Sequence, residues 1–301
     1  MRLWTLIKLV VGAVVLGITV FTGLLVFHVK EKPLGGVFTQ IVPLQQVDPP
    51  KIEKLPEADA SLPDVDPGAK IFEKAGELIA VGDMVAARER LATVVATYPR
   101  SKAAPEARRI LGEMNVDEVL SATHMQGKEL HIVRSGNTFT GIAAKHHTTL
   151  DCIMHLNGLL DLQGLRPGEE LVVMPLEFKV LIEPARKTLS VWDGKNFVKE
   201  YRLVSMDLAG LKTALQTKIV SKEGSSGDRP STPGMKTYPE SKKIFRLEKS
   251  SLQIRSVEYA MDGEIEDLSP GPGFHVAVED AEELALLLRP GNEVEIRAAA
   301  P

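Results

Sequence analysis

The chain has 301 residues, of which 44% are hydrophobic and 25% are charged, a composition typical of folded proteins rather than disordered ones. The length allows two or three domains of roughly 100–200 residues each. Lys and Arg total 36 against 40 Asp and Glu, so the net charge of −4 supplies no basic field for a nucleic-acid backbone, and we expect no nucleic-acid partner. A single cysteine, Cys152, excludes an intramolecular disulfide and a cysteine-rich zinc site.

An uncharged apolar run extends from Leu9 to Phe27. About 20 such residues in a helix span the ~30 Å hydrocarbon core of a bilayer. The run is longer than the ~7–15 apolar residues of a signal peptide and no small-residue cleavage site follows it, so it predicts an uncleaved signal anchor. A cleaved signal peptide and a buried core helix are the alternatives. Arg2 and Lys8 before the run balance Lys30 and Lys32 after it, so these charges do not determine the orientation.

Residues 32–67 are rich in proline and acidic residues and show no sustained periodicity. This composition indicates an extended linker. At ~3.1 Å per residue in a polyproline-like conformation, the linker would hold the later domains away from the bilayer.

Residues 68–122 carry apolar side chains at helical spacing in three groups, which predicts three amphipathic helices. Gly82-Asp83 separates the first helix from the second, and the Tyr-Pro-Arg-Ser segment at 98–101 separates the second from the third. These turns and the small residues around them resemble one and a half tetratricopeptide units. Because such repeats usually need about three units to stand alone, two interpretations remain: a helical hairpin packed on its neighbours, or a peptide-binding groove.

Residues 129–175 predict a compact β-α-α-β unit. Thr138 can cap the first helix, and either Thr149 or Asp151 can cap the second. Turns that contain glycine follow the first strand and precede the last one. A strand at each end would therefore enclose two short helices.

Three motifs in this unit occur in a characteristic order: V-x-x-G-N-T-F-x-x-I-A, then I-x-x-L-N-G-L, then L-R-P-G-E-x-L-x-V-x-P. Together they resemble the LysM family over the whole unit. That family binds the N-acetylglucosamine-containing glycan of peptidoglycan or chitin, in a shallow groove between the first turn and the loop after the second helix. The resemblance implies that the glycan-binding residues are Gly136, Asn137, Thr138, Phe139, Asn157, Gly158, Leu159, Arg166, Pro167 and Gly168.

These groove residues would bind through backbone and amide hydrogen bonds to the N-acetyl groups of the sugar. The chain departs from the family at Asn137, where the family usually has Asp. The alternative interpretation is that Gly136, Asn157 and Gly168 serve turn geometry alone.

His146, His147 and His155 lie near Cys152 in the same unit. We do not expect a metal site here, because Cys152 lies next to Ile153 on a face predicted to be buried, and a free cysteine usually behaves as a small hydrophobic core residue. No cofactor is expected either.

From residue 178 onward the apolar residues alternate with polar ones, which predicts β-strands in a half-buried sheet. The clearest strands fall at residues 178–184, 187–194, 196–204 and 215–221. A short amphipathic helix is predicted at Glu279–Leu288, followed by a last strand, EVEIR. The region should be mostly β with one late helix.

Three pieces of this region resemble the L,D-transpeptidase catalytic domain: the strand L-S-V-W-D-G, the segment S-T-P-G at 231–234, and the ending E-D-A-E-E-L…G-N-E-V-E-I. The family needs a cysteine thiolate in S-x-G-C-x-R and an upstream histidine in an H-G motif. Neither motif is present. Residues 269–275, where the nucleophile should lie, read S-P-G-P-G-F-H, and no histidine lies between His155 and His275. Cysteine-based acyl transfer is therefore excluded, and we predict a pseudoenzyme with no catalytic residues.

A Ser269/His275 pair is the one substitute for the missing thiolate, because a serine nucleophile needs a positioned base. Pro270 and the glycines beside it are more simply interpreted as turn residues.

The predicted organisation is a multidomain α+β protein. Its segments are an anchor at 1–31, a linker at 32–67, tetratricopeptide-like helices at 68–122, a LysM domain at 129–175, and an L,D-transpeptidase-like domain at 177–298. Because a wall-binding module is useful only outside the cytoplasmic membrane, the N-terminus should be cytoplasmic and the later domains periplasmic or outside the cell.

Three functions follow from this organisation. The first is a membrane-anchored peptidoglycan-binding protein with a silent transpeptidase-like domain, which could also hold an envelope protein partner. The second is a wall enzyme with an unrecognised set of catalytic residues. The third is an envelope scaffold that acts through its helical segment. The missing cysteine and histidine argue against the second, and the shortness of the helical segment weakens the third, so we favour the first.

Overall fold

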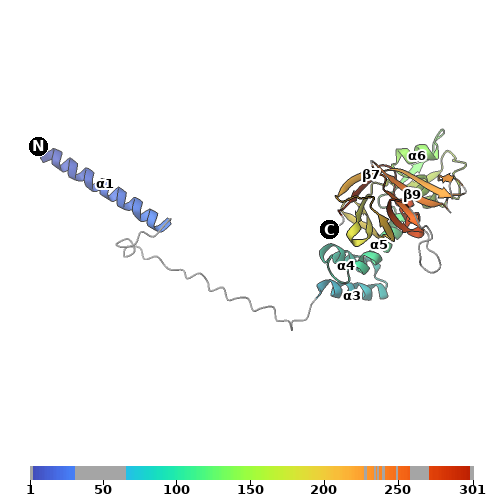
Figure 1. Ribbon diagram of the computed structural model, residues 1–301, viewed down its shortest axis with the longest axis horizontal. Helices are drawn as coiled ribbons and strands as arrows, with labels where there is room; N and C mark the ends of the chain where they lie inside the picture. Colours follow the sequence, from blue (N-terminus) through green and yellow to red (C-terminus); the bar gives the residue numbers. More distant parts are fainter. Residues whose placement is uncertain are drawn as a thin grey trace. The chain divides into compact units, whose positions relative to one another are not determined.

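The computed structural model describes residues 3–30, 66–226, 229–233, 235, 237–238, 241–248, 250–257 and 271–298 (Figure 1). The chain divides into two units, residues 1–64 and 65–301, and we describe each by itself. The predicted linker lies outside the described residues except for its last two. These two belong to a helix, because Asp66 caps its first turn and Pro67 begins it.

In the first unit, helix α1 (Leu3–Lys30) contains the predicted apolar run. Its Ile7–Phe27 segment has 21 residues and a mean hydropathy of 2.6, so its length and composition would let it cross a membrane. An apolar helix so close to the N-terminus is compatible with a membrane anchor and with a signal sequence.

The second unit begins with the three predicted helices, α3 (Pro67–Ala80), α4 (Met84–Thr97) and α5 (Ala104–Leu120). The break at Gly82-Asp83 is confirmed, and the Asp83 carboxylate accepts a hydrogen bond from the backbone N–H of Ala86 at 3.1 Å. The helices share a small core of their own, which includes Leu91 and Leu111. Helix α5 also packs along the edge strand β5 (Asn196–Arg202), so the segment is a helical hairpin packed on its neighbour.

The predicted β-α-α-β unit is also confirmed. It consists of β1 (Glu129–Ile132), α6 (Phe139–Lys145), α7 (Leu150–Asn157) and β2 (Glu170–Val173), with β1 and β2 antiparallel. The Thr138 hydroxyl caps α6 by accepting from Gly141 N at 3.1 Å. Thr149 caps α7 by accepting from Cys152 N at 3.3 Å, so of the two candidate caps Thr149 has the role and Asp151 does not.

The rest of the second unit is a large mixed sheet with one late helix, α8 (Val278–Leu287). Among the described residues ten strands form this sheet, in the order β5-β4-β3-β12-β7-β9-β10-β11-β6, with β8 also paired to β7. Besides β5, the strands are β3 (Lys179–Glu183), β4 (Thr188–Asp193), β6 (Ser205–Asp207), β7 (Leu215–Ser226), β8 (Arg229–Ser231), β9 (Lys242–Leu247), β10 (Gln253–Val257), β11 (Gly273–Ala277) and β12 (Glu293–Ile296).

The four clearest predicted strands correspond to β3, β4, β5 and β7, and the predicted late helix and last strand are present as α8 and β12. The long strand β7 joins the two halves of the sheet, because it pairs with β12 on one side and with β9 on the other. A short 3-10 helix, Pro184–Arg186, turns the chain from β3 into β4. Strands β6 and β8 to β11 were not predicted.

One buried core connects the parts of the second unit. It contains Val116 of α5, Cys152 and Leu156 of α7, and Leu284 of α8, together with the inward-facing residues of the sheet. Burial of apolar surface contributes about 25 cal/mol per Å², so this shared core is what holds the helical segment and the β-α-α-β unit against the sheet.

Candidate functional site

A shallow groove with a volume of about 330 Å³ lies on the β-α-α-β unit, between the first turns of its two helices and the loop that leads to β2. Its lining side chains come from the start of α6, the start of α7 and the loop before β2: Thr138, Phe139, Thr140, Leu150, Leu162 and Leu165. None of these six side chains carries a titratable group. Next to the groove, Leu160 is 98% exposed, which is unusual for a large apolar side chain. Apolar walls with a few hydroxyls suit a neutral ligand that has both apolar and hydrogen-bonding groups.

The turn before α6 shapes one end of this groove. Asn137 closes the turn, because its Oδ1 accepts a hydrogen bond from Arg134 N at 2.9 Å and lies 3.1 Å from Nε2 of His131. Gly136 has a φ of +84°, a left-handed conformation that glycine adopts without strain. The amide at Asn137 therefore orients the turn.

Of the ten predicted glycan-binding residues, Thr138 and Phe139 line the groove. Leu159 is half-buried and packs against the core of the unit. Arg166, Pro167 and Gly168 form an exposed turn, in which Gly168 N donates to Val133 O at 2.9 Å.

Asn157 and Gly158 lie at the end of α7. The Asn157 Nδ2 donates to Ile153 O and Val172 O, both at 2.8 Å, and its Oδ1 accepts from Val172 N at 2.7 Å. The two bonds to Val172 join α7 to β2, the bond to Ile153 lies within α7, and together they leave the amide engaged inside the unit. Gly158 ends α7 with a φ of +61°.

Sequence reasoning missed four of the six lining residues: Thr140, Leu150, Leu162 and Leu165. Two of them lie in the leucine-rich loop at 159–165, where leucines without helical or strand periodicity could have indicated an exposed apolar surface.

Two histidines of the unit, His131 and His146, form a short hydrogen-bonded chain with Glu129, whereas His147 lies 3.5 Å from Glu177 and the exposed His155 lies in α7. Nδ1 of His131 lies 2.9 Å from Nε2 of His146, and Nδ1 of His146 lies 3.4 Å from a Glu129 carboxylate oxygen. Burial, together with the neighbouring charges of His131 and Lys145, lowers the pKa of His146. Within the described residues no cluster of three or more His, Cys, Asp or Glu side chains could hold a metal ion.

Cys152 lies on the opposite side of the unit, on the face of α7 that enters the shared core. The side chain is 0% exposed, and burial raises the pKa of its thiol to about 11. A thiol in this state is a poor nucleophile near neutral pH.

The β-α-α-β unit matches a known family. The stretch 131–173 matches the LysM domain family. Residues 131–173 form a LysM domain. No curated protein sequence matches the chain.

Several solved structures resemble the chain. They include an L,D-transpeptidase of Stackebrandtia nassauensis (15% identity, 42% of this chain and 57% of that one, TM-score 0.30). Another is an L,D-transpeptidase from Mycobacterium smegmatis (12% identity, 44% and 64%, TM-score 0.29). A fused Zn-dependent amidase/peptidase/peptidoglycan-binding protein from Clostridium acetobutylicum has 11% identity, 40% and 51% coverage and a TM-score of 0.28. The chain thus spans between half and two thirds of the length of each of these three structures.

The LysM domain is fixed to the sheet by a buried polar contact. The Asp151 carboxylate forms an ion pair with Lys222 of β7 and accepts a hydrogen bond from the Tyr238 hydroxyl at 3.2 Å. Lys222 also donates to Ala285 O of α8 at 2.7 Å, and burial lowers the pKa of its ammonium. Each buried charge is therefore paired, which is the condition for keeping such groups in a core.

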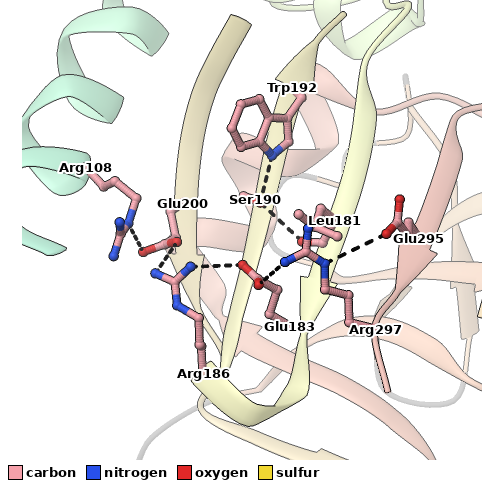
Figure 2. Close-up of polar contacts among 9 residues, drawn as sticks. All are labelled: Arg108, Leu181, Glu183, Arg186, Ser190, Trp192, Glu200, Glu295 and Arg297. Atoms are coloured by element: carbon pink, nitrogen blue, oxygen red, sulfur yellow. Dashed lines mark hydrogen bonds and ion pairs between the residues drawn. The ribbon is translucent and has the colours of Figure 1, made fainter. Parts of the chain in front are cut away.

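A second polar contact fixes the helical segment to the sheet (Figure 2). Arg108 of α5 donates to Glu200 of β5 at 2.9 Å, and Arg186 lies 3.3 Å from the same carboxylate. Glu183 then pairs with Arg186 at 3.0 Å and with Arg297 at 2.6 Å. The Arg108–Glu200 pair is the most buried part of this network, and it joins α5 to β5 together with the Lys199–Glu113 ion pair.

The segment in which a nucleophile was sought is only partly described, and Ser269 and Pro270 lie outside the described residues. In the remainder, Phe274 is fully buried in the core. Gly273 has a φ of +140°, and a Cβ there would lie 2.0 Å from Gln253 O, so the position cannot carry a side chain. Residues 271–275 thus offer no exposed nucleophile.

His275 makes a contact that sequence reasoning missed. Its Nδ1 lies 2.7 Å from the Ser205 hydroxyl, and its Nε2 lies 3.1 Å from Gly271 O. Because a carbonyl can only accept, Nε2 donates to Gly271 and Nδ1 accepts from Ser205. His275 is 2% exposed. The two residues lie on the paired strands β6 and β11, and 70 residues of sequence separate them, so no local pattern connects them.

Proposed function

We propose that this chain is a membrane-anchored protein of the cell envelope that binds peptidoglycan glycan through its LysM groove. The LysM match associates the protein with the cell wall. The observation that carries the proposal is the groove itself, whose six lining side chains include hydroxyls and apolar groups but no titratable group. An N-acetylated sugar offers the matching chemistry, since it presents apolar C–H and methyl surface beside hydroxyl and amide groups.

Co-sedimentation of the full chain, in mild detergent, with insoluble peptidoglycan tests this proposal. Thr140 is exposed and lines the groove, so Thr140→Arg should block the groove with bulk and charge and leave the fold intact. The expected result is that the wild type sediments with the wall and that Thr140→Arg stays in solution. Thr93→Arg, an exposed position on α4, is the matched control and should sediment like the wild type. Equal sedimentation of Thr140→Arg and wild type would exclude the groove as the binding site.

We also infer that α1 anchors the protein, with the N-terminus in the cytoplasm. The uncharged length of Ile7–Phe27 supports an anchor, and a wall-binding module supports an external location for the second unit. Protease added to intact spheroplasts should digest the second unit. If the protein has the reverse orientation, the second unit should stay intact. Release of the protein into a soluble periplasmic fraction would indicate a cleaved signal sequence instead.

The C-terminal region is proposed to be non-catalytic. The only thiol of the chain is buried and has a raised pKa, and His275 hydrogen-bonds through both ring nitrogens. The alternative, a wall enzyme with other residues, is favoured by one observation, the 2.7 Å contact between Ser205 and His275. Purified protein incubated with stem-peptide substrates should show no acyl transfer. Turnover that Ser205→Ala abolishes would establish the alternative.

A further inference from the structure

One edge of the LysM sheet is unpaired. Val133 N donates to Glu169 O at 2.8 Å, so the main-chain N–H of Val133 points toward the β2 side of the sheet. Because hydrogen-bonding direction alternates along an antiparallel strand, the N–H and C=O groups of Leu130 and Ile132 point to the other edge. Over the described part of the chain, the sheet contains β1 and β2 alone and no hydrogen bond uses those groups. They are available to a further strand.

The side chains at this edge are also unusual for an exposed strand. Leu130 and Ile132 are each 57% exposed, and both lie on the outer face of the sheet, opposite to buried His131. Natural edge strands commonly carry charges or prolines that prevent pairing with another chain. An edge with two exposed large apolar residues is typical of an interaction surface.

A groove of about 510 Å³ runs along this edge. One wall is β1, and the other is helix α6 with Gly141, Ile142 and Lys145. The groove meets the glycan groove at Thr138, which lines both. It is large enough to receive side chains that alternate along an added strand.

The two Lys and Arg side chains that line this groove are positive, and no Asp or Glu is among its described lining residues. Arg134 and Lys145 both line it and are exposed, and within the described residues neither forms an ion pair. The nearby acid, Glu129, lies 3.4 Å from His146. Two lining cations that form no ion pair within the described residues favour an acidic ligand.

We propose that the β1 edge binds an extended, acidic segment of a partner protein by β-strand addition. The segment would pair with the free main-chain groups of Leu130 and Ile132 and cover their side chains. Its carboxylates would contact Arg134 and Lys145. Main-chain pairing supplies affinity, and the charges supply specificity. This proposal does not depend on glycan binding, which uses the groove on the other side of Thr138.

The test uses the full chain in mild detergent and two fluorescein-labelled octapeptides, one alternating glutamate with valine and the other lysine with valine. Fluorescence anisotropy at low salt should show that the acidic peptide binds at least about tenfold more tightly than the basic one. Leu130→Pro removes one outward N–H without touching the β1–β2 ladder, and proline is tolerated at such an edge position. We expect this variant to weaken binding about tenfold, whereas Leu130→Val should bind like the wild type.

Charge variants provide a second arm that does not change the strand. Arg134→Glu with Lys145→Glu should abolish the preference for the acidic peptide, whereas Lys195→Glu, an exposed lysine in the β4–β5 turn, should leave it unchanged. Failure of both peptides to bind, equal binding of the two, or insensitivity to Leu130→Pro would each overturn the proposal. Self-association of the chain that Leu130→Pro abolishes, without peptide binding, would assign the edge to a second copy and also overturn it.

Discussion

The two sides of the LysM domain are built in opposite ways. On one side, α7 inserts Asp151, Cys152 and Leu156 into the core shared with the sheet, where the Asp151 carboxylate contacts Lys222 and the Tyr238 hydroxyl. On the other side, the groove and the loop at 159–165 expose Thr138, Thr140 and Leu160, while the other leucines there are only partly buried. The docked side should therefore respond to substitution through stability, and the open side through binding. Four substitutions test this division.

The largest effect is expected at Asp151, on the docked side. Asp151→Ala leaves the buried ammonium of Lys222 without its carboxylate, and loss of one partner of a buried ion pair typically costs about 3–5 kcal/mol. The free energy of unfolding of the full chain, measured with urea, should fall by that amount. Asp161→Ala, at an exposed position in the same domain, is the control and should change it by less than about 1 kcal/mol. Equal losses in the two variants would contradict the buried pair.

Asn157 should come next. Asn157→Ala removes two hydrogen bonds between α7 and β2 and one within α7, and it leaves Val172 N–H without its acceptor, at a cost of about 2–3 kcal/mol. Wall binding by the folded fraction should be unchanged, since the amide is engaged inside the domain. Asn196→Ala, at an exposed asparagine, is the matched control. Full stability of Asn157→Ala combined with lost wall binding would give Asn157 the ligand-contact role instead.

His146 adds a smaller, pH-dependent effect. Its pKa is lowered in the folded state, so the unfolded chain binds more protons between that folded value and about 6.5, and stability falls as the pH falls through this window. The loss is limited by one proton to less than about 1.4 kcal/mol per pH unit. Thermal unfolding between pH 7.5 and 5 should show a drop in Tm that His146→Gln reduces. The exposed His155→Gln should leave the drop as it is in the wild type.

The smallest effect on stability is expected at Leu160. A side chain that is 98% exposed has little burial to lose, so Leu160→Ser should change the free energy of unfolding by less than about 0.5 kcal/mol. Because the leucine lies beside the groove, its loss should still reduce the fraction of protein that sediments with peptidoglycan. Unchanged sedimentation would restrict the ligand contact to the groove itself.

The LysM domain could be predicted in detail because its structure is local. Thr138 caps the helix that begins at the next residue by accepting from Gly141 N, and Gly158 ends the next helix by its own conformation. The ion pair of Asp151 with Lys222 could not be predicted, since 71 residues separate its partners and no local pattern connects them. Strands β10 and β11 were missed for a related reason. The two strands pair in parallel, and β11 is buried along almost its whole length, so it lacks the alternation that marks a half-exposed strand; β10 does alternate, but over only five residues.

The sequence by itself determined the elements whose signals lie within a few residues: the apolar run of α1, the three helices and their breaks, and the LysM motifs with their caps. It also determined the chemistry available, because a single cysteine and the missing H-G motif can be read without a structure. Only the tertiary structure decided where that cysteine lies, which amides serve the fold, that Ser205 contacts His275, and that no strand of the described residues pairs with the second edge of β1. Such features depend on contacts between residues far apart in the chain, and those contacts are set by packing of the whole core rather than by local preference.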